Sequence, residues 1–317
     1  MKISILSLLL VFIFVSCNQN ESGTIAYQIP EKKLIPEGIA WSEKHNKFFL
    51  SSIHLSKIIE IDAQDGSYKD FINSRNYGFL SGIGLQADDE SNRLYAIGTS
   101  TSSDDKGSGL FVFNMDDGRL VKKYMADTTE KHFFNDLTID NEKNVYITDT
   151  QQSKIYFLNR KNDKLTTFLK GKEVLYPNGI VISSDNGKLY IASHVNGIRI
   201  FDLTSGEFLN DIDSTDATKG IDGLKYYNNT LIGVQNGYRD SIKIVQFILD
   251  KEGKQIVDKN ILDINNPHFN VPTTGVVVCD KYYCIANSQL PYLDQEKNEI
   301  LDTTKLKETH ILRYNLN

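Results

Sequence analysis

Short apolar runs rich in β-forming residues recur along the chain in a unit of about 45 residues. Each unit opens with a polar residue, then in every unit but the third a Gly, and then Ile, Leu or Val. A second run with an aromatic or apolar centre follows, and then a third. The six openings are Glu37-Gly38-Ile39, Ser81-Gly82-Ile83, Asn135-Asp136-Leu137, Asn178-Gly179-Ile180, Asp222-Gly223-Leu224 and Thr274-Gly275-Val276.

The runs have the length of strands, and turn dipeptides such as Asp65-Gly66, Asp117-Gly118 and Asn186-Gly187 separate them. No stretch shows sustained helical periodicity. About four strands in a repeat of this length are typical of a β-propeller blade. The six copies therefore predict an all-β, six-bladed β-propeller.

An N-terminal strand is expected to close this propeller. The sixth unit offers strands at residues 276–278, 282–286 and 310–314 and is one strand short. Residues 24–29 are strand-like and precede the first unit, so they would supply the missing outer strand and remove an exposed sheet edge. The propeller thus spans residues 24–317, interrupted by a long polar insertion at 290–307, a kind of loop that is often functional or mobile.

The start of the chain has the features of an export signal. Lys2 precedes an apolar run over residues 3–15 that is too short to span a bilayer comfortably. Ser16-Cys17 follows, and this arrangement resembles a bacterial lipoprotein signal. Residues 1–16 are then the signal peptide, Cys17 is the lipidated residue, and 17–23 form a tether. The alternative is an ordinary secretory signal with an incidental cysteine. The lipoprotein interpretation predicts that the protein is lipid-anchored in the cell envelope, on the periplasmic or surface side of a membrane.

Composition narrows the function classes. A net charge of −6 argues against electrostatic capture of nucleic acid or of an anionic membrane surface. Three cysteines are too few for a disulfide scaffold. Cys279 and Cys284 flank a hairpin turn: a four-residue loop would let them form a disulfide, whereas a two-residue turn at Asp280-Lys281 would leave two buried thiols. The oligomeric state cannot be read from the sequence.

The polar residues that open the six units carry the candidate chemistry. First strands line the channel of a propeller, so Glu37, Ser81, Asn135, Asn178, Asp222 and Thr274 should form one ring near one mouth. All are oxygen donors, which favours Ca²⁺ before Mg²⁺ or another hard divalent cation. The alternative is that Asn178-Gly179 and Asp222-Gly223 are only turn dipeptides. Glu37 and Asn135 do not fit that alternative.

The sequences Pro36-Glu37-Gly38-Ile39-Ala40-Trp41, Phe134-Asn135-Asp136-Leu137, Pro177-Asn178-Gly179-Ile180 and Asp222-Gly223-Leu224 resemble the senescence marker protein/gluconolactonase family and its paraoxonase-like relatives. These are calcium-dependent six-bladed propellers. The resemblance implies that Glu37, Asn178 and Asp222 are metal ligands, that Asn135 faces metal or substrate, and that Asp222 is a general base. Sugar lactonases commonly carry Arg where this chain has Phe133, and paraoxonases carry a catalytic His where it has Ser81.

Loops after the second strands should overhang the same mouth. They offer Asp149, Asn236 and Gln289 as substrate contacts and His194 as a proton-transfer partner, although a surface histidine without catalytic duty is the alternative. His132 lies near the entry to the third blade. The candidate substrate-binding residues are therefore Ser81, His132, Phe133, Asp149, Asn236, Thr274 and Gln289. The expected function is a Ca²⁺-dependent hydrolase of a small ester or lactone; the alternative is a ligand- or partner-binding propeller with a structural metal ion.

Overall fold

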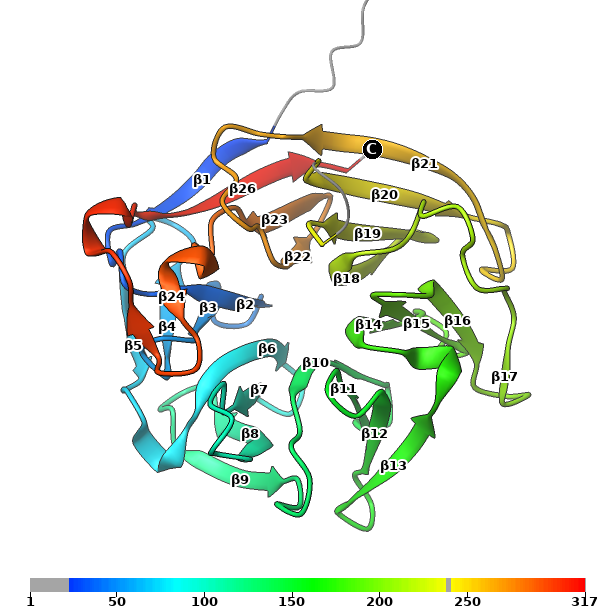
Figure 1. Ribbon diagram of the computed structural model, residues 1–317, viewed down its shortest axis with the longest axis horizontal. Coiled ribbons are helices and arrows are strands. Elements are labelled where there is room, and N and C mark those ends of the chain that lie inside the picture. Colours follow the sequence, from blue (N-terminus) through cyan, green and yellow to red (C-terminus); the bar gives the residue numbers. More distant parts are fainter. Residues whose placement is uncertain (1–22, 238–240, 317) are drawn as a thin grey trace, which may run out of the picture.

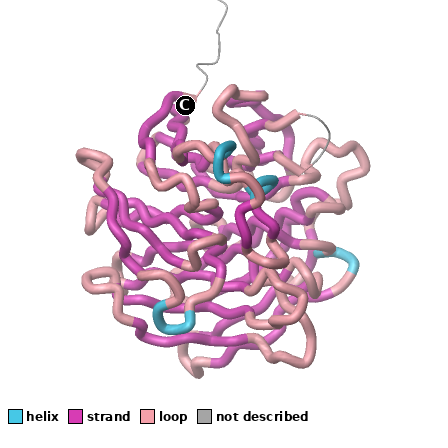
Figure 2. Tube along the Cα trace, turned by 60° about the vertical axis from the view of Figure 1, so that its left-hand side comes forward, coloured by secondary structure: helices cyan, strands magenta, loops and turns pink. Residues whose placement is uncertain are grey.

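Six four-stranded antiparallel sheets surround a central axis in the computed structural model, which describes residues 23–237 and 241–316 (Figure 1). Helix is limited to short turns between the strands (Figure 2). The predicted six-bladed β-propeller is confirmed. In the described part of the chain no helix is long and apolar enough to cross a membrane. The predicted signal peptide and Cys17 lie outside the described residues.

The strands follow the chain order of the repeats. Blade one holds β2 (Pro36–Ser42), β3 (Lys47–Ser52), β4 (Lys57–Asp62) and β5 (Tyr68–Ile72); blade two holds β6 (Ser81–Asp88), β7 (Arg93–Thr99), β8 (Ser108–Asn114) and β9 (Leu120–Met125); blade three holds β10 (Phe134–Ile139), β11 (Val145–Asp149), β12 (Lys154–Asn159) and β13 (Lys164–Lys170). Blade four holds β14 (Pro177–Ile182), β15 (Lys188–Ser193), β16 (Gly197–Asp202) and β17 (Glu207–Phe208); blade five holds β18 (Ile221–Tyr227), β19 (Thr230–Gln235), β20 (Lys243–Leu249) and β21 (Ile256–Ile264). Short 3₁₀ turns are η1 (Asn76–Gly78) and η2 (Lys172–Val174).

The sixth blade closes the ring as expected. Its sheet order is β1 (Thr24–Ile29), β26 (Thr309–Asn315), β23 (Lys281–Ile285) and β22 (Gly275–Val278). The register of β1 on β26 runs from Thr24 opposite Arg313 to Ile29 opposite Thr309. Figure 1 shows the two strands, blue and red, side by side at the rim. Segments from the two ends of the sequence therefore share one sheet.

The second strands have apolar centres because a neighbouring blade covers each of their faces. In β3, Phe48 packs against Tyr283 of blade six with ring centroids 4.9 Å apart. The next residue, Phe49, points the other way and joins a buried cluster with Leu85 and Leu94 of blade two. Alternate side chains of one strand thus bury against two different blades. This accounts for the continuous apolar runs in the sequence.

A β-bulge interrupts the first strand of blades one to five. In blade one, Pro36 pairs with Ser52 and Ile39 with Leu50, so Glu37 and Gly38 together oppose only Ser51. The same two-against-one arrangement occurs at Ile83-Gly84, Asn135-Asp136, Asn178-Gly179 and Asp222-Gly223. A bulge redirects the side chain that it carries. It therefore turns the first residue of each pair away from the regular pleat.

The glycines of these pairs permit close contact between neighbouring inner strands. A Cβ on Gly179 would lie 2.4 Å from the Asp222 carbonyl oxygen, and one on Gly223 would lie 2.1 Å from Thr274 Oγ1. Neither glycine has a positive φ. Asn178-Gly179 and Asp222-Gly223 lie inside β14 and β18, so the alternative interpretation as turn dipeptides is wrong.

The hairpin that contains the cysteines differs from both predicted forms. Val278 pairs with Lys281, so the two-residue turn is Cys279-Asp280, and Gly275 rather than Cys279 faces Cys284. Both cysteines are free, with Cys279 exposed and Cys284 buried. The turn sits one residue earlier than the two-residue alternative placed it. A disulfide is therefore absent, and only one of the two thiols is buried.

The insertion at residues 290–307 is packed against the propeller. It contains η3 (Leu290–Tyr292), a small hairpin of β24 (Leu293–Asp294) and β25 (Glu299–Ile300), and η4 (Thr303–Lys305). Leu293 and Leu306 are buried in a cluster with blades two and three. The Glu296 carboxylate accepts hydrogen bonds from the backbone N–H and hydroxyl of Ser103, at 2.7 and 2.6 Å. The insertion is thus a structured cover next to the mouth of the channel.

Candidate functional site

The bulges of blades one, three, four and five each bring one polar side chain to a common ring. The pattern of exposure repeats: Glu37, Asn135, Asn178 and Asp222 are partly exposed, whereas the residues directly before and after each of them are buried. Thr274, just before β22, completes the circle, because Gly223 of blade five lies against it. These five polar positions therefore lie on or next to inner strands that adjoin one another around the channel.

The second blade departs from the predicted ring. Its bulge residue is Ile83, which is buried, and Gly38 of blade one lies against the Ile83 carbonyl oxygen. Ser81 lies two residues earlier and lines a separate cavity of about 430 Å³ together with Arg75, Ser100 and Glu296. The ring consequently has an apolar side at blade two.

Asp222 is held by amide groups. Asn236, from the loop after β19, donates from Nδ2 to Asp222 Oδ2 at 2.7 Å and also to the Pro272 carbonyl at 2.6 Å. The Asn178 side chain also hydrogen-bonds Asp222. Burial raises the pKa of Asp222 to about 7, against the opposing effect of these two amides. Without a bound cation, this carboxyl therefore keeps its proton to a higher pH than an ordinary aspartate does.

Glu37 shares this environment with two other carboxylates. Burial raises the pKa of Glu37 well above its usual range, and the charges of Asp222 and Asp136 raise it further. Carboxylates this close raise one another's pKa unless a cation is bound between them. The electrostatics of the ring are those of a site for positive charge.

Several buried oxygens at the ring lack a hydrogen-bond partner within the described residues, among them Glu37 Oε2, Thr274 Oγ1 and Ser288 Oγ. A divalent cation would satisfy such atoms. No group of three His, Cys, Asp or Glu side chains is arranged to hold a metal in residues 23–237 and 241–316. An ion here would depend on two carboxylates, Glu37 and Asp222, with amide oxygens from Asn178 and Asn135. This all-oxygen set fits Ca²⁺.

Asn135 is oriented by a short hydrogen-bond chain. Its Nδ2 donates to Thr150 Oγ1 at 3.0 Å, and that hydroxyl donates to the Pro177 carbonyl at 2.6 Å. With the amide nitrogen engaged in this way, the carbonyl oxygen of Asn135 is the atom available to a ligand.

Three of the other predicted residues have structural contacts. Asp149 Oδ2 is 2.6 Å from His132 Nδ1, while its other oxygen accepts from the backbone N–H of Phe133 at 3.0 Å and of Gln152 at 3.2 Å. His132 and Asp149 are both buried. Gln289 donates to and accepts from the Lys307 backbone, which anchors the end of the insertion.

The remaining two stand apart from the acidic ring. Phe133 packs on the apolar cluster of blades two and three. His194 is exposed and lies beside Gly237, and no described contact joins its ring to Asp222.

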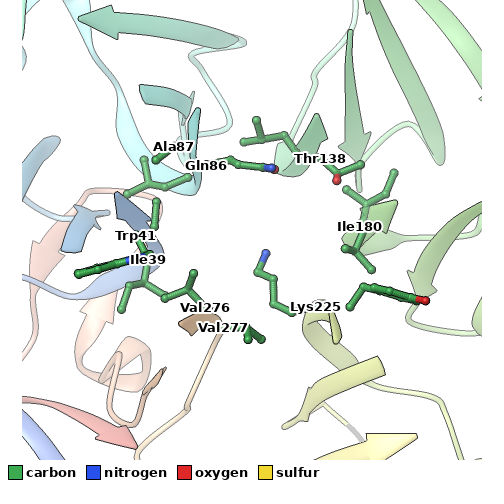
Figure 3. A pocket seen from close by; sticks show the side chains of 14 residues that line it. Ile39, Trp41, Gln86, Ala87, Thr138, Ile180, Lys225, Val276 and Val277 are labelled. Atoms are coloured by element: carbon green, nitrogen blue, oxygen red, sulfur yellow. The ribbon is translucent and has the colours of Figure 1, made fainter. Parts of the chain in front are cut away.

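The central channel continues below the ring as a cavity of about 230 Å³. Its wall is mainly apolar and includes Ile39, Ile180 and Val276 (Figure 3). Lys225 projects into it, and its Nζ lies 3.5 Å from Asp136 Oδ2. Neither residue was predicted as functional. The available signal for Asp136 is that it alone replaces the Gly of the repeat; for Lys225 the sequence offers no signal.

Comparison with known proteins identifies the family of the chain and supports its fold. A family model described as "SMP-30/Gluconolactonase/LRE-like region" matches residues 35–227, more than half of the chain. No curated protein matches. Among solved structures, a gluconolactonase from Xanthomonas campestris has 13% identity and a TM-score of 0.62, covering 91% of this chain and 87% of its own.

Two further solved structures share the fold. The allergen Mala s 1 of Malassezia sympodialis has 15% identity and a TM-score of 0.64, covering 93% of this chain and 97% of its own. A PQQ-bound aldose sugar dehydrogenase from Streptomyces coelicolor has 13% identity and a TM-score of 0.63, with coverages of 92% and 98%. At these identities the likeness shows the propeller fold alone. The matched family region contains the blades that carry Glu37, Asn135, Asn178 and Asp222, and the chain belongs to the SMP-30/gluconolactonase/LRE-like family.

Proposed function

We propose that the protein is a metal-dependent hydrolase of the lactonase or esterase type that acts on a small ester or lactone at the mouth of the propeller. The observation that carries this proposal is the meeting of Glu37 and Asp222, with raised pKa values, beside oxygens that lack a partner among the described residues. Glu37, Asn178, Asp222 and Asn135 would hold Ca²⁺. When bound, the ion would polarise the ester carbonyl and stabilise developing negative charge.

The chain's own groups would position substrate and move the proton. Asn236 holds Asp222 in place through Oδ2, and this carboxylate would take a proton from the attacking water. Asn135 presents its amide oxygen to a substrate hydroxyl. Ile83 and the insertion at 290–307 would limit water on one side of the pocket. His194, on the loop after β15, is a second candidate for proton transfer.

A non-catalytic binding propeller with a structural ion is the second candidate. Phe133 packs into the apolar cluster where sugar lactonases commonly have Arg, and His194 has no described contact with Asp222. These two observations reduce the number of polar groups that a transition state would meet at the pocket.

A panel of lactones and aryl esters, assayed with Ca²⁺ and with EDTA, separates the two candidates. The hydrolase predicts turnover that EDTA abolishes and that Asp222→Asn lowers by about 100-fold or more, the usual contribution of a general base. Asp258→Asn, on the exposed outer strand β21, is the matched control and should leave turnover unchanged. Ion binding without turnover of any substrate would support the binding propeller instead.

We also propose that the chain is a lipoprotein of the cell envelope, lipidated at Cys17. Ser16-Cys17 at the end of the apolar run supports this. Metabolic labelling with a radioactive fatty acid should mark the wild type and not Cys17→Ser. Labelling of neither protein, with both found in the soluble fraction, would refute it.

A further inference from the structure

Asp136 is a third carboxylate at the ring, and Lys225 faces it across the channel. Asp136 follows Asn135 on β10 of blade three, whereas Lys225 lies on β18 of blade five, three residues after Asp222. The Lys225 side chain therefore crosses open space to reach its partner, and Figure 3 shows its amino group well inside the channel. Its Nζ is 3.5 Å from Asp136 Oδ2.

Neighbouring residues hold the Asp136 carboxylate of this pair in position. Gly84 of blade two makes room for Asp136, because a Cβ there would lie 2.9 Å from Asp136 Oδ1. That oxygen accepts the backbone N–H of Leu137 at 2.9 Å, while Oδ2 has no hydrogen-bond partner in the described part of the chain. Asp136 is only 6% exposed. Lys225 is thus the counter-charge for an otherwise unpaired, buried carboxylate.

The Asp136–Lys225 pair affects the total charge at the ring. Glu37, Asp136 and Asp222 carry three negative charges when ionised, and a divalent ion balances two of them. Lys225 balances the third from the channel side. We propose that Lys225 is a fixed positive charge that neutralises Asp136 and thereby sets the affinity of the ring for a single divalent ion. Lys225 is a positioning residue in this role, and the proposal rests on the proposed function for the presence of the ion.

Four forms of the full-length protein test the proposal: wild type, Lys225→Met, Asp136→Asn and the double variant. Calorimetric titration of Ca²⁺ should rank them by the net charge of the pair. Lys225→Met, with net charge −1, should bind Ca²⁺ about tenfold or more tightly than wild type, because a nearby like charge is removed. Asp136→Asn, with net charge +1, should bind at least about tenfold more weakly. The double variant should return close to wild type.

Lys259→Met, on the exposed face of β21, is the matched control and should change affinity by less than about twofold. A purely structural role for the pair would weaken Ca²⁺ binding in both single variants. The proposal is overturned if both single variants shift affinity in the same direction, or if neither shifts it.

Melting in EDTA makes the result independent of the metal. Lys225→Met should lower the melting temperature by leaving Asp136 buried and unpaired, and adding Asp136→Asn should restore most of the loss. If the changes in melting temperature of the two single variants simply add up in the double variant, the pairing is refuted. If wild type binds neither Ca²⁺ nor Mg²⁺, the proposed function fails, and the melting cycle alone then decides the role of Lys225. A Lys225→Met protein that does not fold while the double variant folds would support the pairing.

Discussion

Asp222 is surrounded by groups that both oppose and favour its charge. Burial and Asp136 disfavour the carboxylate, while the amides of Asn236 and Asn178 favour it, and the balance raises its pKa from 3.8 to about 7. Glu37 has a raised pKa for the same first reason, burial. These residues would bind a cation readily because the cation would relieve a repulsion that is already present.

The raised pKa of Asp222, which is due first to burial, predicts how stability depends on pH. The folded, metal-free protein holds a proton on Asp222 up to about pH 7, whereas the unfolded chain releases it near pH 3.8. The native state therefore binds more protons in this interval, and stability falls as pH rises through it. Melting temperatures in EDTA should fall between about pH 5 and about pH 7. Excess Ca²⁺ should reduce the fall, and a melting temperature that rises over this interval in EDTA would contradict the assignment.

A variant of Asp149 can show whether this residue holds the structure together or belongs to the site. Its carboxylate accepts from His132 and from the backbone of Phe133 and Gln152, so it clamps the entry of blade three. Asp149→Asn should cost about 1–3 kcal/mol of unfolding free energy, the usual penalty for unsatisfied buried groups. Chemical denaturation measures this. Ca²⁺ affinity should stay within about twofold of wild type, and a large loss of affinity would place Asp149 in the site.

At the scale of single strands, the bulge turns a polar side chain toward the ring, and the glycine beside it lets the neighbouring inner strand pack closely. Gly179→Ala would put a Cβ 2.4 Å from the Asp222 carbonyl oxygen and 2.6 Å from the Leu224 nitrogen, both backbone atoms. We expect a loss of about 2 kcal/mol or more in unfolding free energy, because backbone cannot give way as a side chain can. Calcium affinity should fall as well, since Asp222 would shift.

Gly187→Ala is the control for this variant. A Cβ there meets only the Asp185 carboxyl group, at 3.2 Å or more, so the chain should tolerate it with less than about 1 kcal/mol of loss. Equal losses in the two variants would show that the tight contact at Gly179 is unimportant.

Strand periodicity explains which parts of the site could be predicted. The repeat of polar residue, Gly and aliphatic residue located four of the ring positions, Glu37, Asn135, Asn178 and Asp222, because each occupies the same bulge. The predicted ring position in blade two, Ser81, was wrong because residues 81–85 contain two overlapping copies of the Gly-aliphatic pattern. The pairing of Leu85 with Ala96, equivalent to that of Ile39 with Leu50, shows that the second copy is the true one.

Contacts that cross the molecule could not be predicted in this way. Lys225 and Asp136 come from different blades and meet only because the ring closes around the channel. The His132–Asp149 pair similarly depends on the path of the chain into blade three. Sequence periodicity describes the neighbours of a strand within its sheet, and it contains no information on side chains that meet across the axis.

At the scale of the whole molecule, the ring depends on closure by β1. Ile29 is fully buried against blades six and one, and β1 pairs with β26 along its length. Deleting residues 24–29 would expose the edge of β26 and should lower the melting temperature by roughly 10 °C or more. Ile25→Ala, at an exposed position of the same strand, is the control and should change it little. Unchanged melting of the deletion variant would mean that β1 does not lock the propeller.

The most direct test of the account is calorimetric titration of Ca²⁺ into EDTA-treated wild type and Asp222→Asn, with melting curves of both. We expect one ion per chain for wild type, and a melting temperature that rises with Ca²⁺ concentration by mass action. Asp222→Asn should lose most of the calcium binding yet melt at a higher temperature than wild type in EDTA, because a repulsive carboxyl is gone. Absence of binding by wild type, or undiminished binding by the variant, would contradict the claim that these blades form one cation site.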